Sequence, residues 1–285
     1  MADFGGVQYE KIGNADVYLG ENMASVLPSL IPNEFKAGHI ALLYFDEEKT
    51  VAEKVLANLK TGKIDVYECK LDSGLSDEKS LFAARQIPEY VRYVIGVGTE
   101  RAANICSAVA TSLNVDFALF VTAPSSDRFL FGTDETVDTK IASLIVADIA
   151  ILEDCPKPLL AAGWGIALAE RLRIFEKCVA DKTSGKSLLG FRDGESIAEV
   201  FKRTIKQQTI DLSPNVDELF WYLLNLSERK RNEKFKGGVE TFCEILQLTD
   251  KTRERGEYMF IASYVLWGYY KCFLSSSAFD VLLPP

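Results

Sequence analysis

Histidine is almost absent from this sequence, because His39 is the only one among 285 residues. Histidine is the commonest metal ligand and a frequent general base, so a single copy excludes any metal site built on two histidines. It also leaves a serine triad with His39 alone as its base. His39 opens an apolar run that ends at Phe45, a position more typical of a structural residue at a strand edge than of a catalytic one.

Paired cysteines, a basic excess and long apolar runs are also lacking. The six cysteines are scattered and form no Cys-x-x-Cys pair, which is typical of buried reduced thiols. The net charge of −9 argues against a nucleic-acid partner, and we interpret the basic run Arg229–Arg231 as a solvated helix end. No apolar run is long enough to span a membrane, and Met1–Gly6 has no secretory features. We therefore expect a cytoplasmic protein.

The first half alternates short apolar runs with amphipathic segments, which predicts a doubly wound parallel sheet covered by helices. Apolar residues recur with helical spacing in the amphipathic segments at residues 49–59, 77–87 and 100–113. The predicted strands are His39–Phe45, Lys63–Cys69, Val91–Val97, Phe117–Val121 and Asp148–Leu152.

The pattern changes after Pro156-Lys157-Pro158, beyond which no strand is predicted. Helical spacing recurs at residues 159–178, 196–209, 216–226, 238–246 and 257–274. We predict an α/β Rossmann-like domain over residues 1–155, followed by an all-helical bundle domain over residues 156–285. Thr183–Ser187 looks like the end of a phosphate-binding P-loop, but Ala180 stands where that motif needs glycine, so we predict a loop between helices.

A strand that ends in Gly-x-Gly and runs straight into a helix is the most informative segment. Gly96 and Gly98 would let the backbone approach a diphosphate, and the helix that follows Thr99 offers unpaired N–H groups. Glycines there also permit a simple turn, and Glu100 would repel a phosphate. Asp46 follows the first predicted strand, where an acid commonly holds a ribose hydroxyl; an ordinary helix N-cap is the alternative.

The fourth predicted strand runs into a loop rich in hydroxyl groups. Ligands bind beyond the carboxyl ends of parallel strands, so Thr122, Ser125 and Ser126 are candidates for cofactor contacts. Asp127 could accept a hydrogen bond from a substrate hydroxyl or could cap a turn. We assign cofactor binding to Asp46, Gly96, Gly98, Thr99, Thr122, Ser125 and Ser126, and substrate binding to Asp127.

Four segments in order resemble the superfamily of iron-containing alcohol dehydrogenases, glycerol dehydrogenases and 3-dehydroquinate synthase. They are Gly96-x-Gly98, Thr122–Asp127, Ala147–Ala150 and Leu159–Gly165. The resemblance implies a dehydroquinate synthase-like fold, with NAD(P) and a divalent metal in the cleft between an α/β and a helical domain. It also implies that an aspartate and histidines of the helical domain hold this metal.

The departures from that family concern the metal and the cofactor loop. Ile166 stands where the resemblance implies the metal-binding aspartate, and the first histidine falls near Tyr258 or Tyr264. The second has no equivalent before Pro285. We therefore expect no metal, although NAD(H) remains a candidate cofactor. The family's Gly-Gly-Gly-Ser loop is replaced by residues 98–101, and its aspartate and lysine farther along that helix fall near Asn104 and Ser107.

Three functions remain open at this point. The first is a divergent homologue that has lost the metal site, with absent or altered catalysis. The second is an active NAD-linked alcohol or polyol dehydrogenase, or a synthase-like enzyme acting on a polyol or sugar phosphate. The third is a changed synthase or lyase reaction without metal. The expected ligand is a small nucleotide or polyol, and a homo-oligomer is left open.

Overall fold

A computed structural model describes most of the chain, and contacts within it divide the chain into two compact units. The first unit comprises residues 1–157 and 216–232, and the second comprises residues 158–215 and 233–285. The predicted domain boundary after residue 155 lies near the first division point. The described residues are 6–36, 38–74, 77–84, 86–130, 140–184, 199, 215–231, 235–250 and 253–274.

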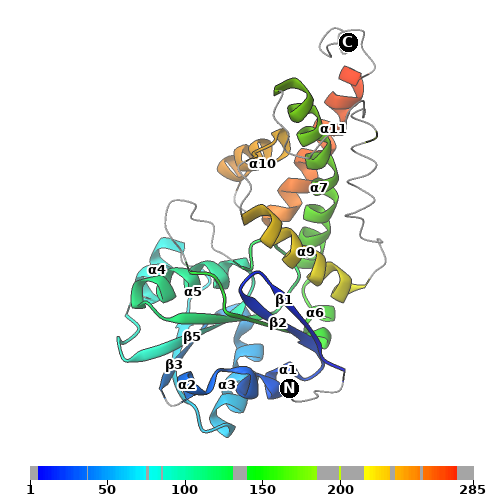
Figure 1. The fold of residues 1–285 in the computed structure, drawn as a ribbon. Helices are drawn as coiled ribbons and strands as arrows, with labels where there is room; N and C mark the ends of the chain where they lie inside the picture. Colours follow the sequence, from blue (N-terminus) through cyan, green and yellow to red (C-terminus); the bar gives the residue numbers. More distant parts are fainter. Residues whose placement is uncertain are drawn as a thin grey trace. The chain divides into compact units, whose positions relative to one another are not determined.

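The first unit is built on one seven-stranded sheet in the order β1-β2-β7-β6-β5-β3-β4 (Figure 1). All neighbouring strands are parallel except β1 and β2, which form an antiparallel pair at one edge. The predicted parallel sheet is thus confirmed, with one antiparallel strand added. The strands are β1 (Gln8–Ile12), β2 (Ala15–Gly20), β3 (His39–Phe45), β4 (Asp65–Leu71), β5 (Val91–Gly98), β6 (Asp116–Val121) and β7 (Leu144–Asp148).

Both faces of the sheet are buried, because successive side chains of each strand enter opposite cores. In β3, Ala41, Leu43 and Phe45 enter one core, while Ile40, Leu42 and Tyr44 enter the other. The first core includes residues of α4 (Asp77–Ala84), α5 (Glu100–Leu113) and α6 (Ile149–Glu153). The second includes residues of α1 (Met23–Leu30) and α3 (Lys49–Thr61). Short turns of α2 (Asn33–Lys36) and η1 (Asp46–Glu48) flank β3.

Helix α9 (Val216–Arg231) belongs to the sheet-bearing unit, although its sequence position suggested the helical domain. Phe220 and Leu224 are fully buried in the same core as α5. The Trp221 indole N–H also donates a hydrogen bond of 2.7 Å to Oε1 of Gln8 in β1. The apolar face of α9 is therefore buried in the core of the sheet unit. This burial explains why the helix belongs to that unit and not to the predicted helical domain.

One predicted strand was wrong, and two strands were missed. Asp148–Leu152 does not form a strand, because β7 ends at Asp148 and α6 begins at Ile149. The Asp148 carboxylate accepts a hydrogen bond of 3.1 Å from the Ala150 N–H, so this residue caps the helix and stops the strand. Strands β1 and β2 were not predicted at all.

The second unit contains three described helices: α7 (Lys157–Ser184), α10 (Gly238–Thr249) and α11 (Arg255–Leu274). Helices α7 and α11 cross at glycine and alanine residues, since a Cβ added to Gly256 would lie 1.9 Å from the Ala162 carbonyl oxygen. This approach explains the small residues around Gly165 by packing. The helix predicted at residues 196–209 lies outside the described residues, apart from a helical position 199. Thr183 and Ser184 of the P-loop-like segment end α7.

The cysteines are all free thiols, as the scattered pattern indicated, but not all are buried. Cys106, Cys178 and Cys243 are buried, whereas Cys272 is exposed on α11. Within the described residues, no helix combines the length and apolar character needed to cross a membrane.

Candidate functional site at the carboxyl edge of the sheet

The polar residues of interest gather where parallel strands β3, β5, β6 and β7 end. From β3 the chain passes to β4 on one side and then returns to β5 on the other, so the topology reverses between β3 and β5. In open α/β sheets, ligands bind in the crevice outside the carboxyl ends of the strands at such a reversal. The predicted site residues therefore share one edge of the sheet.

The Gly98 turn lies at the centre of this edge. Gly98 has φ +147°, a conformation that side chains rarely adopt, and Thr99 follows it as the N-cap of α5 without a side-chain capping bond. The first-turn N–H groups of a helix have no carbonyl partner within the helix. The start of α5 therefore offers N–H donors beside Gly98, and binding of a diphosphate there stays a prediction.

Gly96 also has a packing role, and its predicted contact with a cofactor stays a prediction. A Cβ at this position would lie 2.5 Å from Sγ of Cys106 on α5. Cys106 is fully buried in the core between α5 and the sheet. The absence of a side chain at Gly96 therefore lets α5 pack closely on β5.

The acid beside the Gly98 turn is Glu48, which the sequence had not singled out. A Cβ at Gly98 would lie 3.6 Å from Oε1 of Glu48, and this oxygen accepts a hydrogen bond of 3.0 Å from the Thr122 hydroxyl. Burial raises the pKa of the Glu48 carboxyl, and the neighbouring Glu47 raises it further. Asp46 forms a half-exposed ion pair of 2.6 Å with Lys70, and its role as a ribose ligand stays a prediction.

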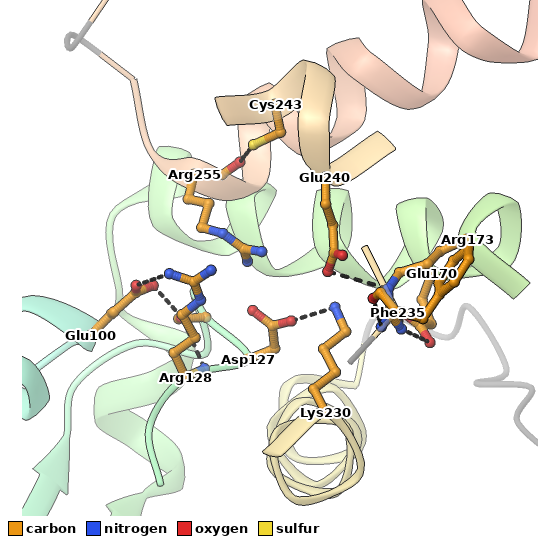
Figure 2. A network of polar contacts seen from close by, with 11 residues as sticks. Glu100, Asp127, Arg128, Glu170, Arg173, Lys230, Phe235, Glu240, Cys243 and Arg255 are labelled. Atoms are coloured by element: carbon orange, nitrogen blue, oxygen red, sulfur yellow. Dashed lines mark hydrogen bonds and ion pairs between the residues drawn. The ribbon is translucent and has the colours of Figure 1, made fainter. Parts of the chain in front are cut away.

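The residue expected to repel a phosphate, Glu100, is neutralised within the site. Its carboxylate forms an ion pair of 3.8 Å with the Arg128 guanidinium (Figure 2). It also accepts a hydrogen bond from the Ser126 hydroxyl. The Arg128 N–H in turn donates to Ser126 Oγ at 3.1 Å. Ser126 therefore organises this loop, and Ser125 beside it is buried.

Asp127 forms the most buried ion pair of this edge. One of its carboxylate oxygens lies 2.6 Å from the Lys230 ammonium of α9, and the two side chains are 1% and 10% exposed (Figure 2). Lys230 was not predicted, because 103 residues separate it from Asp127. A sequence pattern carries no signal for such a pair.

Asp148, at the end of β7, is a structural residue of the same edge. Besides capping α6, its carboxylate accepts a hydrogen bond of 2.8 Å from the Met23 N–H at the start of α1. The carboxylate therefore joins two helix starts to the end of one strand.

The positions that the resemblance assigns to a metal carry no suitable donors. Ile166 is fully buried, and the Tyr258 hydroxyl donates to the Asp250 carbonyl oxygen at 2.7 Å. Tyr264 is exposed. His39 lies at the amino end of β3, opposite the ligand edge, with its ring 4.6 Å from that of Tyr90. Within the described residues, no group of three or more His, Cys, Asp or Glu could hold a metal ion. The expectation that the protein needs no metal stays a prediction.

The second unit has a separate buried polar cluster on α7 and α10. Nη1 of the fully buried Arg173 donates to both oxygens of Glu170, at 3.1 and 3.2 Å, and its Nε lies 3.2 Å from Glu240 (Figure 2). One turn farther along α7, Glu176 accepts from the Val239 N–H at 3.1 Å and from the Tyr270 hydroxyl at 2.6 Å. Burial raises the pKa of Glu176. These contacts tie α7 to α10 and α11.

The sequence is similar to curated proteins of one kind, the glycerol-1-phosphate dehydrogenases. Glycerol-1-phosphate dehydrogenase [NAD(P)+] from Metallosphaera sedula is 27% identical over 176 residues, which cover 55% of this chain and 50% of that protein. The chain spans about half the length of the curated relatives it matches. No protein-family model matches the sequence.

Solved structures share the fold over most of the chain. Glycerol dehydrogenase from Schizosaccharomyces pombe has a TM-score of 0.64 at 15% identity, covering 90% of this chain and 70% of its own. A 2-deoxy-scyllo-inosose synthase has a TM-score of 0.55 at 13% identity, covering 90% and 74%. The fold is thus dehydroquinate synthase-like, as predicted. Together with the curated relatives, it supports the resemblance of the chain to the superfamily of glycerol dehydrogenases, iron-containing alcohol dehydrogenases and 3-dehydroquinate synthase.

Proposed function

We propose that this chain is a metal-independent member of the superfamily that binds a nicotinamide dinucleotide but has lost metal-assisted alcohol chemistry. The buried Ile166 carries the proposal. A hydrocarbon side chain cannot ligate a cation, and the single histidine of the sequence lies at the opposite edge of the sheet from the ligand crevice. A divalent metal would stabilise a developing alkoxide by several kcal/mol, and the described residues offer no ligand set for one.

The Gly98 turn supports binding of the dinucleotide. The turn at Gly98 carries no side chain, α5 presents its first N–H groups, and Thr99 adds a hydroxyl. One of the two acids at this turn is compensated, because Arg128 pairs with Glu100. The Glu48 carboxyl remains beside Gly98 without a cation among the contacts that it makes at this turn. A bound nicotinamide would supply hydride transfer. The residues of this chain would hold the diphosphate and sugar at the carboxyl edge of the sheet.

A second candidate is an active NAD(P)-linked dehydrogenase of a polyol or sugar phosphate. The names of the curated relatives favour it, since they are glycerol-1-phosphate dehydrogenases. In that case another group would have to stabilise the alkoxide.

Two measurements on the purified full-length chain separate these candidates. Elemental analysis should find far less than one zinc, iron or nickel per chain, and NAD(H) titration should show saturable binding after treatment with a chelator. Stoichiometric metal, or dihydroxyacetone phosphate reduction that stops when metal is removed, would overturn the proposal in favour of the second candidate. Absence of NAD(H) and NADP(H) binding would overturn both.

A further inference from the structure

Helix α11 keeps an exposed apolar face after it has packed within the second unit. Its inner side approaches the backbone of α7 at Gly256 and buries Met259 and Ala262. The outer side carries four aromatic residues that are between 47% and 76% exposed, namely Phe260, Tyr264, Trp267 and Tyr269. A helix that is apolar all round is normally buried all round. The outer face of α11 therefore calls for a partner that covers it.

The area of this face is large for a surface without a function. At about 200 Å² for a whole aromatic side chain, the four aromatic residues expose roughly 500 Å². The largest apolar patches on monomeric proteins have about this size and often serve a function. Each partner in a standard protein interface buries about 800 Å², so these side chains alone would supply more than half of that area.

Charge favours a second copy of this chain as the partner. The net charge of −9 makes two copies repel each other, so self-association needs a surface free of like charges. Helix α11 has no charged residue between Glu257 and Lys271, and these two residues carry opposite charges. A membrane fits this face less well, because helices that lie on a membrane carry Lys and Arg along a polar face, and anionic lipids repel an acidic protein.

The order of residues along this face matches an antiparallel pair of identical helices. One stripe of α11, with spacings of three or four residues, consists of Glu257, Phe260, Tyr264, Gly268 and Lys271. The stripe is symmetric about Tyr264, because an aromatic ring and a glycine lie four residues to either side and opposite charges lie seven residues to either side. A two-fold axis at Tyr264 therefore places Phe260 of one copy opposite Gly268 of the other. The same axis places Glu257 beside Lys271 of the second copy.

The residues that would face each other are accessible for these contacts. A Cβ added to Gly268 would have no neighbour within 4 Å, so this position leaves space for the Phe260 ring of a second copy. Glycine inside a helix costs about 1 kcal/mol relative to alanine, and the close approach of another helix is a reason to keep it. Lys271 is exposed, and the Glu257 side chain is 27% exposed beside Arg253, with which it forms an ion pair of 3.6 Å.

We propose that α11 forms the interface of a homodimer, in which it packs antiparallel against the same helix of a second copy with Tyr264 on the two-fold axis. The aromatic residues exclude water from the centre of the interface. Two pairs between Glu257 and Lys271, one at each end, fix the register of the two helices. The proposed interface uses no residue of the Gly98 turn, so it does not depend on nucleotide binding.

Sedimentation equilibrium of the full chain over a range of concentrations tests the interface. The parent chain should dimerise. Tyr264→Glu should raise the dissociation constant about a hundredfold or more, because it sets two carboxylates against each other on the axis. Phe82→Glu is the matched control, since it adds the same charge in place of a similarly exposed aromatic residue on α4, and it should associate like the parent. Helical circular dichroism shows whether each variant is folded.

A charge swap tests the register. Lys271→Glu should weaken the dimer about tenfold, because two attractions between opposite charges become two repulsions. The double variant Glu257→Lys/Lys271→Glu should regain the affinity of the parent, and a double variant that binds no tighter than Lys271→Glu would overturn the antiparallel register. A folded Tyr264→Glu variant that associates like the parent would overturn the interface. So would a parent that stays monomeric at every concentration, and binding of that monomer to neutral phosphatidylcholine vesicles would assign the face to a membrane.

Discussion

The Glu48 carboxylate accepts a hydrogen bond of 3.0 Å from the Thr122 hydroxyl and so joins the ends of β3 and β6 beside the Gly98 turn. Glu48 is largely withdrawn from solvent, and burial raises its pKa. A negative charge at this point disfavours both folding and an incoming diphosphate. The same residue therefore links stability, pH and nucleotide binding.

Glu48→Gln should stabilise the protein at neutral pH and leave it unchanged in acid. A carboxyl whose folded pKa is raised costs stability above its unfolded pKa, and this cost grows until pH exceeds the folded value. The glutamine amide keeps an acceptor for the Thr122 hydroxyl and carries no charge. The melting temperature of the variant should therefore exceed that of the parent protein by a few degrees at pH 7.5 and match it near pH 4. Thermal unfolding over that range checks this, and NADH affinity at pH 7.5 should rise.

Glu53→Gln is the control for this experiment, because Glu53 is exposed on α3 and forms a surface ion pair with Lys49. Such pairs contribute little to stability. A gain at Glu48→Gln that is equal at both pH values would contradict the role assigned to its charge.

Gly96→Ala should destabilise the sheet unit by about 1–3 kcal/mol through overpacking against Cys106. The added Cβ would lie 2.5 Å from the Cys106 sulfur but 3.6 Å from its Cβ, which is an ordinary contact. Cys106→Ala should therefore recover most of the loss in the Gly96→Ala background, although alone it leaves a small cavity. Urea unfolding of the four proteins in a double-mutant cycle measures the coupling, and additive effects would show that the sulfur is not the obstacle.

The sequence predicts most of the fold, because the buried strands are continuous apolar runs. The bounds of β3 and α5 agree with the prediction, since His39–Phe45 and Glu100–Leu113 have unambiguous strand and helix patterns. Strand β1 escaped prediction because four of its five residues are exposed and polar or aromatic. The two-residue turn at Gly13-Asn14, with Gly13 at φ +58°, was the available signal for this hairpin.

The candidate site was predicted by position more than by contact. The edge that holds Gly98, Thr122 and Asp127 follows from the parallel topology, which the apolar runs had indicated. Asp46 and Glu48 both lie in the short turn η1, and the backbone of this turn places the side chain of Glu48, not that of Asp46, beside Gly98. A sequence pattern does not distinguish two acids that are only two residues apart. Lys230 reaches Asp127 only because α9 packs on the sheet unit, a tertiary contact that no local pattern encodes.

Gly256→Ala and Gly268→Ala should have opposite effects, although both lie in α11. A Cβ at Gly256 would lie 1.9 Å from the Ala162 carbonyl oxygen of α7, and backbone cannot yield as a flexible side chain can. We expect a loss of about 3 kcal/mol or more, or failure of the second unit to fold. Gly268 has no neighbour within 4 Å of its added Cβ, so alanine should stabilise the helix by about 0.5–1 kcal/mol. Chemical unfolding followed by helical circular dichroism compares them, and equal effects would contradict the close crossing of α7 and α11.

Arg173→Met should be the most destabilising charge removal in the second unit, at about 3–5 kcal/mol. It would leave the Glu170 carboxylate, only 3% exposed, without the guanidinium that donates to both its oxygens. Glu240 would lose a partner too, but its side chain is 15% exposed and can be hydrated. The double variant Glu170→Met/Arg173→Met removes the buried charge with its partner, and it should therefore regain most of the lost stability. Urea unfolding of the parent and of the single and double variants tests this prediction. A double variant that is no more stable than Arg173→Met would show that the arginine acts mainly through its packing and through its 3.4 Å hydrogen bond to the Phe235 carbonyl.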